Sequence, residues 1–341
     1  MRPDPQTPVD AQAFDRSKGA LYGLAIGDAL GMPSQTLTRA EIAQHYGQIT
    51  GFVAPCEGHP VSHGLSAGQV TDDTEQSLLL ARRLILDPTG FDDLGWARDL
   101  MGWEADIRAR GLRDLLGPSS KAALSALLDG VSPELTGLRG TTNGAAMRIA
   151  PVGIMTPPDP AQIARKVAMT CRVTHNTGEA IGGAAAVAMV VSAGISGMTF
   201  EEAVPLALEA ALLGQQAGSD FGESDMQARL TRALEVAQRG DVAALVDAIG
   251  TSVQSRESVA TAFGLLRLTG GDGWAAMLLA ANIGDDTDTI GAMAGAMAGA
   301  CQGASALPGA AIGRIEAANA LDIPALARSL LALRHSERSM A

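Results

Sequence analysis

Aromatic side chains are scarce in this sequence: Phe, Trp and Tyr make up 3% of its 341 residues. The hydrophobic core must therefore be built mainly from Ala, Leu, Met and Gly, and Gly alone occurs 40 times. Ala and Leu favour helices, whereas strands are rich in aromatic and β-branched residues. No segment shows the alternation of apolar and polar residues that a half-buried strand needs. The composition predicts an all-α fold.

Cysteines are also few, and the three present, Cys56, Cys171 and Cys301, are scattered along the chain. An odd and unclustered set gives neither a disulfide framework nor the spacing of a zinc site. The first twelve residues are polar and rich in proline, without the apolar run of a secretory signal. We therefore expect a cytoplasmic protein.

Positive charge is in deficit, because 25 Lys and Arg residues face 37 Asp and Glu residues, which gives a formal net charge of −12. Nucleic-acid affinity comes largely from neutralised phosphates, so no nucleic-acid binding is expected. With 47% hydrophobic and 18% charged residues, most of the chain is too apolar to be disordered. Some of the surplus acids can instead hold cations.

Charge is absent from two long stretches, residues 181–200 and 289–313, and each is long enough to span a bilayer. Both consist mostly of Ala and Gly and contain little Leu, Ile or Phe to drive insertion. In the second stretch glycines recur four residues apart, a spacing that clears one helix face for close backbone contact. We predict two buried helices and no membrane insertion.

Helical patterns follow one another along the chain without a linker, a composition shift or a fixed-period repeat. The helices that bear on the motifs below are expected at 14–30, from Thr71 to 86, at 177–196, at 287–302 and at 308–333. We predict a compact single-domain helical globule over residues 14–336, preceded by a flexible segment, residues 1–13.

Two short strings concentrate oxygen-bearing side chains: residues 71–74 read Thr-Asp-Asp-Thr, and residues 285–289 read Asp-Asp-Thr-Asp-Thr. Neighbouring carboxylates repel one another unless a cation lies between them. Asp and Thr offer only hard oxygen ligands, which favour Mg²⁺, Mn²⁺ or Ca²⁺ over zinc. We predict that the two strings, far apart in sequence, converge on a shared pair of ions.

Helix capping is the alternative reading of these strings, because Asp and Thr are common at helix starts, where they accept hydrogen bonds from free N–H groups. The Thr71 hydroxyl, for example, is placed to cap the helix that follows it. Capping needs only one or two such residues, and all five residues of 285–289 are of the capping type. Metal binding is the better hypothesis.

Two weaker signals lie between the strings. Asn143 and Gly144 form a turn that leads towards Arg148, and exposed backbone N–H groups with a nearby cation can cradle a phosphate. Most Asn-Gly turns, however, are only turns. His175 precedes another helix, where a lone histidine is more often a cap or a surface residue than a catalyst.

Together and in this order, the motifs resemble the ADP-ribosylglycohydrolase family, which includes the dinitrogenase-reductase-activating glycohydrolase. The matching strings are residues 19–31, 71–74, 142–148, 174–176, 257–259 and 284–289. The resemblance implies an all-α globule with a dinuclear Mg²⁺ or Mn²⁺ centre at the base of a cleft. It implies metal ligands from both acid strings, namely Thr71, Asp72, Asp73, Asp286, Asp288 and Thr289.

The resemblance also implies roles in catalysis and substrate binding. Asp72 or Asp286 would be the catalytic carboxylate that orients or deprotonates the attacking water. Substrate contacts would come from Gln35, Asn143, Gly144, Ala145, Ala146, Met147, Arg148, His175 and Phe263. Phe263 falls at the family's adenine-facing position, although from the residues alone it is as well suited to the core.

The chain departs from the family pattern at Gln35, where the family usually has a glutamate near the metal site, and at Ala260, where it usually has a proline. The implied activity is metal-dependent cleavage of the glycosidic bond between ADP-ribose and an acceptor, either a protein side chain or a small molecule. An ADP-ribosylated protein or an ADP-ribose-like molecule is the expected partner. The alternatives are a nucleoside or small N-glycoside hydrolase on the same scaffold, and a non-catalytic ADP-ribose-binding regulator.

Overall fold

The computed structural model describes residues 10–88, 90–112, 116–221 and 225–338. Within these ranges the chain forms eighteen α-helices and one 3₁₀ turn. The only β-type pairings in them are two isolated bridges, between Thr142 and Gln254 and between Thr177 and Ser219. The predicted all-α fold is confirmed.

The helices fill the chain in the following order. Their bounds are α1 (Ala11–Gly31), α2 (Arg39–Tyr46), α3 (Asp72–Leu86), α4 (Asp93–Ala109), α5 (Pro118–Leu128), α6 (Pro133–Thr136), α7 (Gly144–Met147), α8 (Ala150–Met155), α9 (Pro160–Cys171), α10 (Gly178–Ile195), α11 (Phe200–Ala217), α12 (Met226–Ala237), α13 (Val242–Ile249), α14 (Ser255–Leu268), α15 (Gly273–Ala280), α16 (Thr287–Gln302), η1 (Ala304–Ala306), α17 (Gly309–Ala318) and α18 (Ile323–Arg338).

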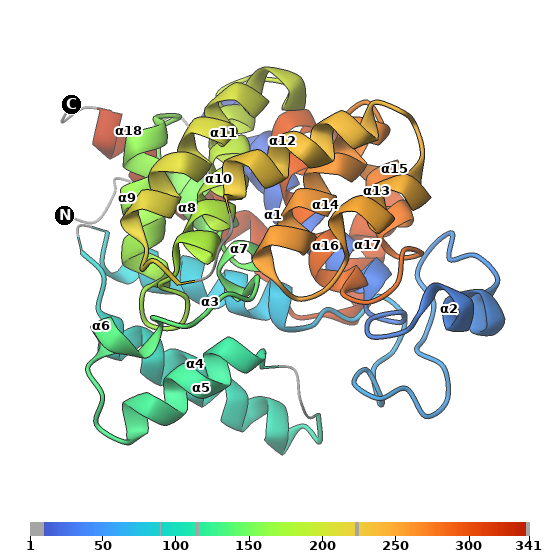
Figure 1. Ribbon diagram of the computed structural model, residues 1–341, viewed down its shortest axis with the longest axis horizontal. Helices are drawn as coiled ribbons and strands as arrows, with labels where there is room; N and C mark the ends of the chain where they lie inside the picture. The colour runs from blue at the N-terminus through green and yellow to red at the C-terminus, as the bar shows by residue number, and fades with distance from the viewer. Residues whose placement is uncertain (1–9, 89, 113–115, 222–224, 339–341) are drawn as a thin grey trace.

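The antiparallel helices α1 and α16 cross at the centre of the molecule, with α1 in dark blue behind the orange α16 in Figure 1. Glycines on both helices let the two backbones touch. A Cβ atom added to Gly295 would lie 2.0 Å from the carbonyl oxygen of Gly23, and one added to Gly27 would lie 2.0 Å from that of Gly291. The glycine face expected on residues 289–313 is therefore real, and α1 supplies the matching glycine face.

Helix α10 is the apolar helix of the core and packs against α11 and α16. In the described part of the chain it is the one helix long and apolar enough to cross a membrane, and that 18-residue window is 100% buried inside the fold. Every residue of α16 from Thr287 to Ala300 is buried as well. The predicted buried helices are thus found at residues 181–195 and 289–300, whereas residues 303–313 of the second stretch leave α16 and include exposed positions.

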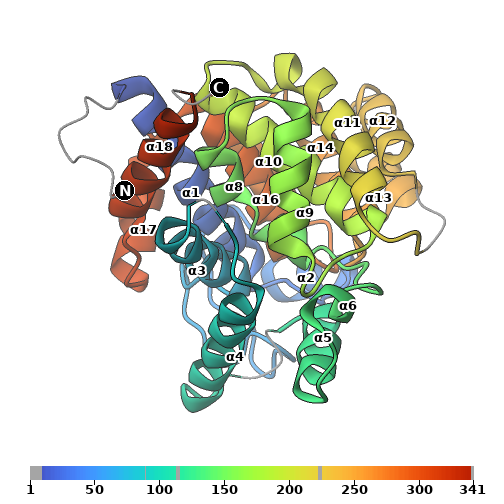
Figure 2. The same cartoon turned by 90° about the vertical axis from the view of Figure 1, so that its left-hand side faces the viewer.

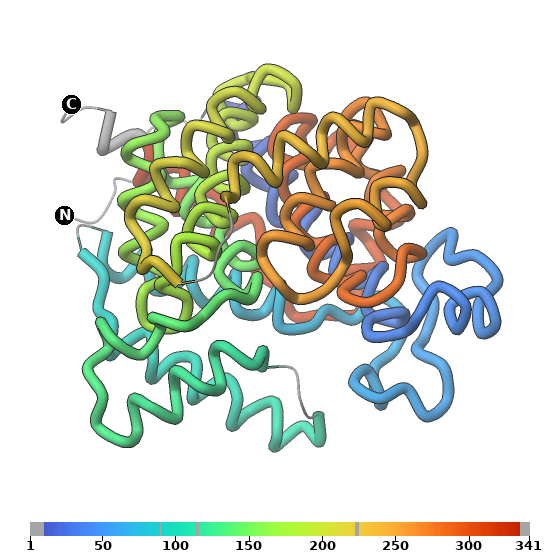
Figure 3. Tube along the Cα trace, in the orientation of Figure 1, coloured from blue at the N-terminus to red at the C-terminus, as the bar shows by residue number. Residues whose placement is uncertain are grey.

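Helices α4 to α6 form a separate layer below the main body, visible in both Figure 1 and Figure 2. Polar contacts join α4 to α3. Glu75 accepts a hydrogen bond of 2.6 Å from Trp103 Nε1 and pairs with Arg110 at 2.8 Å. Arg83 pairs with Asp99 at 2.6 Å. The trace from α2 to α3, in light blue in Figure 3, loops out at the lower right of the body.

The prediction of one helix over 308–333 is wrong, because the chain breaks between α17 and α18. Asn319 leaves the helix and uses its side chain to hold another loop: its Nδ2 donates to the Gly68 carbonyl oxygen at 2.8 Å, and its Oδ1 accepts from the Val70 amide at 3.1 Å. At the other end, α1 begins at Ala11, inside the segment expected to be flexible. Residues 1–9 of that segment lie outside the described residues.

Candidate active site

The site is assembled where the helix starts of α3 and α16 meet α1. Asp28 lies on the buried face of α1 with no exposed surface. Its carboxylate accepts hydrogen bonds from the hydroxyls of Thr71 at 2.8 Å and Thr74 at 2.5 Å, and from the Thr71 amide at 3.0 Å. A Cβ on Gly31, one turn along α1, would lie 2.4 Å from the Asp288 amide nitrogen. The glycine contact between α1 and α16 therefore brings the two acid strings together.

Five carboxyl groups interact at this point, and burial and mutual repulsion raise their pKa values. Burial, followed by repulsion from the neighbouring acids, raises the pKa values of Asp72, Asp73 and Asp288 well above the usual range. Burial raises the pKa values of Asp28 and Asp286 to about 6. Helix N-termini favour negative charge, and two of them point to this cluster. Even so, four buried acids and the partly exposed Asp72 cannot all ionise at neutral pH without a compensating cation.

The capping alternative fails for both acid strings. Thr71 and Asp286 occupy the N-cap positions of α3 and α16, but neither side chain makes a capping hydrogen bond. The Thr71 hydroxyl bonds Asp28 instead, and the Asp286 carboxylate accepts from Asn143 Nδ2 at 2.5 Å. At the start of α15, by contrast, Asp272 caps the Ala275 amide at 3.0 Å. The N-cap side chains of the two strings are therefore directed to residues outside their own helices, whereas Asp288 accepts from the Thr289 amide within α16 at 3.0 Å.

A cavity of about 250 Å³ opens above the acids. Nine of the residues expected at the site line it: Gln35, Asp72, Asn143, Gly144, Met147, His175, Asp286, Asp288 and Thr289. The opposite wall comes from the start of α5, including Pro118 and Lys121. The layer formed by α4 to α6 thus closes one side of the cleft.

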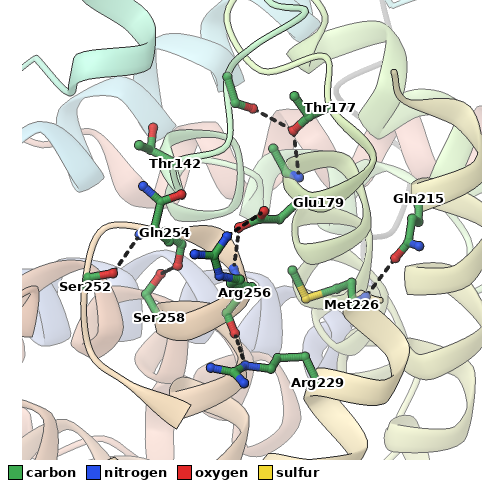
Figure 4. Close-up of polar contacts among 12 residues, drawn as sticks. Thr142, Thr177, Glu179, Gln215, Met226, Arg229, Ser252, Gln254, Arg256 and Ser258 are labelled. Carbon is green, nitrogen blue, oxygen red and sulfur yellow. Dashed lines mark hydrogen bonds and ion pairs between the residues drawn. The ribbon is translucent and has the colours of Figure 1, made fainter. Parts of the chain in front are cut away.

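The wall that carries Asn143 is held by the segment before α14. The Asn143 amide donates to the Val253 carbonyl oxygen at 2.9 Å, and Asn143 Nδ2 also donates to Ser258 Oγ at 2.8 Å. Figure 4 shows Thr142 beside Gln254, with Ser258 bonded to Gln254. The motif at 257–259 therefore acts on the site by fixing Asn143, which in turn holds Asp286.

The same segment is anchored from below by Arg256 (Figure 4). Its backbone amide donates to Glu179 Oε1 at 3.0 Å, and its guanidinium lies 3.5 Å from the same carboxylate. Glu179 stands in the first turn of α10, the core helix. The Asn143 wall is thus tied to the most deeply buried helix of the fold.

Six predicted site residues do not line the cavity: Thr71, Asp73, Ala145, Ala146, Arg148 and Phe263. Arg148 is wholly buried and donates to Gln76 Oε1 at 2.9 Å and to Thr174 Oγ1 at 2.6 Å, so the structure does not place it as a phosphate contact. Phe263 has no exposed surface, and its ring centroid lies 5.8 Å from that of Phe200. It belongs to the core, because it sits on the inward face of α14.

Gln35 is 8% exposed and lies at the cavity with its amide orientation fixed. Its Nε2 donates to Ser62 Oγ at 2.9 Å, and Ser62 Oγ donates to the Met32 carbonyl oxygen at 2.7 Å. This arrangement leaves Gln35 Oε1 as the acceptor that the side chain offers to a ligand.

Two residues next to the acids have a strained backbone conformation. Thr36 has φ 65° and Asp285 has φ 64°, the only non-glycine residues with positive φ in the described chain. Two backbone hydrogen bonds join their segments: the Thr36 amide donates to the Asp285 carbonyl oxygen at 2.7 Å, and the Asp285 amide donates to the Leu37 carbonyl oxygen at 2.9 Å. A β-branched residue in this conformation is unusual, and such strain concentrates at functional sites.

Sequence reasoning assigned no role to Asp28, Thr142 or Lys121. Asp28 carried a usable signal, because it is the only charged residue in the string 19–31. A lone acid in an otherwise uncharged buried helix needs partners. Thr142 opens the string 142–148, although no role was assigned to it, and Lys121 lines the cavity but stands out in no sequence pattern.

The donor set fits hard divalent cations. Asp73 Oδ1 is buried and has no hydrogen-bond partner among the described residues. No group of three or more His, Cys, Asp or Glu side chains in those residues has the arrangement to hold a metal ion as it stands. Threonine oxygens and water would have to complete the coordination, as is common for Mg²⁺. The side chains instead bond one another, as Asp28 does with Thr71 and Thr74.

The fold and site define an all-α protein with carboxylates that converge at the base of a cleft. The family model described as ADP-ribosylglycohydrolase matches residues 9–339, almost the whole chain. The chain belongs to the ADP-ribosylglycohydrolase family, and the predicted resemblance is confirmed. It is accordingly an enzyme with glycohydrolase activity.

Relatives agree with this assignment. The chain is 33% identical to the protein YegU of Escherichia coli K12, over 96% of this chain and 99% of that protein. It is 29% identical to the ADP-ribosylarginine hydrolase Tri1 of Pseudomonas putida, over 87% of this chain and 73% of that one. It is 34% identical to the ADP-ribosyl-[dinitrogen reductase] glycohydrolase of Rhodospirillum rubrum, over 48% of this chain and 52% of that one.

A solved structure agrees on the fold. A chain of an ADP-ribosylglycohydrolase-related protein complex superposes with a TM-score of 0.69 at 26% sequence identity. The match covers 95% of this chain and 99% of that one.

Proposed function

We propose that this enzyme hydrolyses the glycosidic bond between ADP-ribose and an acceptor, a protein side chain or a small molecule, with the help of two Mg²⁺ or Mn²⁺ ions. The observation that carries the proposal is the set of buried carboxylates below a cavity whose walls carry Asn143 and His175. The names of two relatives, an ADP-ribosylarginine hydrolase and a glycohydrolase of ADP-ribosylated dinitrogen reductase, support the substrate class.

Both acid strings would hold the ions. The ligands would come from Thr71, Asp72, Asp73, Asp286, Asp288 and Thr289. Asp28 would position the ligands without binding the ions, because its carboxylate already orients Thr71 and Thr74 through hydrogen bonds. When bound, divalent ions in this place supply positive charge that offsets the carboxylates and makes a nearby water a better nucleophile.

Asp286 is the favoured catalytic carboxylate, with Asp72 as the alternative. Asp286 lines the cavity and is held by Asn143 Nδ2, which fixes the direction in which its carboxylate faces. A carboxylate held in this way can orient a water and accept its proton as the water attacks the anomeric carbon. The bond between the anomeric carbon and the acceptor breaks, the proton accepted by Asp286 passes to the leaving acceptor group, and free ADP-ribose remains.

The Asn143 side of the cleft is suited to the phosphate and ribose oxygens of the substrate. Gly144 leaves its wall open because it has no side chain, and His175 stands beside it, within 3.0 Å of where a Cβ would be. The buried Arg148 does not reach this surface. On this side of the cleft, phosphate contacts would thus rely on neutral donors, and the cationic side chain that lines the cavity is Lys121 of α5.

The direct test is release of free ADP-ribose from ADP-ribosylated proteins with arginine and with serine linkages, compared with release of base from nucleosides and other small N-glycosides. The proposal expects ADP-ribose release that depends on Mg²⁺ or Mn²⁺. Turnover of nucleosides alone would favour the alternative small-glycoside hydrolase, for which the neutral Gln35 is the supporting observation. Binding of ADP-ribose without turnover of any substrate would favour a regulator.

Removal of metal should destabilise the protein. Burial raises the pKa values of Asp28 and Asp286 to about 6, above their usual values, so ionisation disfavours the metal-free fold as pH rises through about 6. Millimolar Mg²⁺ or Mn²⁺ should raise the Tm of chelator-treated protein, and more at pH 7.5 than at pH 5. ADP-ribose should raise the Tm further by mass action. A Tm that neither metal changes at pH 7.5 would contradict the dinuclear site.

Replacing Gln35 by glutamate should change metal affinity or turnover while the fold is retained. The added carboxylate would lie at the cavity and attract a divalent cation over a short range. Metal titration followed by melting, together with steady-state kinetics, measures both effects. Gln216→Glu, at an exposed position of α11, adds the same charge away from the cleft and serves as the control. If the two variants behave alike, Gln35 does not act on the site.

A further inference from the structure

Arg148 is a buried cation whose role the cleft does not explain. It has no exposed surface, and among the described residues no carboxylate pairs with it directly, although the charge of Asp72 favours its ionised form. Its guanidinium carbon lies 5.3 Å from the centroid of the Trp96 ring, and its Nη1 donates to Gln76 Oε1 at 2.9 Å. Burying a cation without a directly paired carboxylate costs folding free energy, so we ask which function the other contacts of Arg148 serve.

The important contact is Nη2, which donates to Thr174 Oγ1 at 2.6 Å. A guanidinium has no acceptor, so the threonine oxygen must accept here. Thr174 has no exposed surface, and its hydroxyl proton needs an acceptor within the protein. His175 Nδ1 lies 2.8 Å from the same oxygen. The hydroxyl is fully satisfied when it donates to Nδ1.

The direction of that bond fixes the histidine. With Nδ1 as an acceptor, the neutral ring carries its proton on Nε2. Nε2 lies 3.0 Å from Thr142 Oγ1, which in turn lies 2.8 Å from Ser119 Oγ at the start of α5. The hydrogen bonds therefore run one way, from Arg148 at the buried end to the cleft. Burial and the Arg148 charge also hold the pKa of His175 well below its usual range, in keeping with a neutral ring.

Two features place His175 and Thr142, the last members of this series of hydrogen bonds, at the cavity. His175 and Thr142 both line it. Gly144 lies against the imidazole, since a Cβ there would sit 2.8 Å from Cε1 and 3.0 Å from Nε2. The imidazole ring thus packs against Gly144 and is hydrogen-bonded to Thr174, and its protonated Nε2 faces the cleft wall.

We propose that Arg148 is a positioning residue that acts through Thr174, holding His175 neutral with its proton on Nε2, where the N–H is directed to Thr142 Oγ1 in this structure and would turn to an oxygen of the substrate when the substrate binds. This assignment rests on the proposed function for the identity of that oxygen, which would belong to ADP-ribose. It replaces the sequence expectation that Arg148 itself contacts phosphate. The cation remains buried and sets the direction of the donors that the substrate meets.

The test is the tautomer of His175 in ¹⁵N-histidine-labelled protein, assigned by the signals that disappear in His175→Gln. The proposal expects an unprotonated Nδ1 and a protonated Nε2 in the wild type. Thr174→Val is nearly isosteric and removes the hydroxyl, so it should mix the two tautomers and weaken ADP-ribose binding about 10-fold, the scale of one hydrogen bond. Thr174→Ser should restore both properties.

Thr170→Val is the matched control. Thr170 is also a buried threonine, on α9, but its hydroxyl donates to the Val167 carbonyl oxygen at 3.1 Å and not to His175. Its replacement should leave the tautomer and the Kd for ADP-ribose unchanged. A protonated Nδ1 in the wild type, or an unchanged tautomer in Thr174→Val, would overturn the positioning role.

The two proposals fail separately. If the wild-type protein shows the expected tautomer and Thr174→Val alters it, the positioning role stands even where ADP-ribose is neither bound nor released. Absence of ADP-ribose turnover with either metal is the result that overturns the proposed function.

Discussion

Asp286→Asn should lower hydrolysis about 100-fold or more while the protein stays folded. An amide cannot accept the proton of an attacking water, and loss of a positioned acid–base group has an effect on this scale. The fold should tolerate the change, because asparagine is nearly isosteric and can still accept the hydrogen bond from Asn143 Nδ2. Burial raises the pKa of Asp286 to about 6, so removal of this charge should slightly raise the Tm without metal at pH 7.5.

The experiment pairs product release with melting in the presence and absence of Mg²⁺. Asp272→Asn is the control, because Asp272 is a true helix cap at the start of α15 and lies outside the cleft. Asparagine caps helices about as well as aspartate, so this variant should keep full turnover. A folded Asp286→Asn protein with near-wild-type activity would refute the catalytic role and leave Asp286 a structural residue.

Gly295→Ala should have the largest effect on stability. The new methyl group would lie 2.0 Å from the Gly23 carbonyl oxygen, so α1 and α16 would have to move apart along their contact. Overpacking of this kind typically costs about 1–3 kcal/mol and sometimes more, and backbone at the contact cannot yield as a side chain can. We expect a loss of about 3 kcal/mol or more of unfolding free energy, measured by urea denaturation. Activity should fall too, because the same contact aligns Asp28 with Asp288.

Gly313→Ala is the matched control for this prediction. Gly313 is exposed within α17, and a Cβ there would meet nothing within 4 Å. Alanine is the better helix former, so this variant should gain up to about 1 kcal/mol. If Gly295→Ala were as stable as the wild type, the close approach of α1 and α16 would be wrong.

Local sequence information was enough for the all-α class and for several of the long helices, and it pointed to the residues of a candidate site. Low aromatic content and abundant Ala and Leu predicted the helices, and the bounds expected for 287–302 agree with α16 at both ends. The two acid strings were found because adjacent carboxylates are costly in any fold. The glycines of α16 indicated a close helix contact before its partner was known.

Local patterns in the sequence could not predict features that depend on contacts between distant residues. The sequence could not show that Asn319 would leave its helix to hold Gly68, since that hydrogen bond joins residues about 250 positions apart. Nor could it decide whether capping positions at Thr71 and Asp286 were used for capping, because that depends on what lies opposite each side chain.

The sequence by itself determined an all-α chain with two oxygen-rich helix starts, because propensity and charge repulsion act between near neighbours. Only the tertiary structure decided how these parts meet: it brought Asp28 to Thr71, placed Phe263 in the core and turned Arg148 inward to Thr174. The direction of a side chain is set by the helix packed against it. That helix comes from a distant part of the chain, so its effect on the direction of the side chain appears only in the complete tertiary structure.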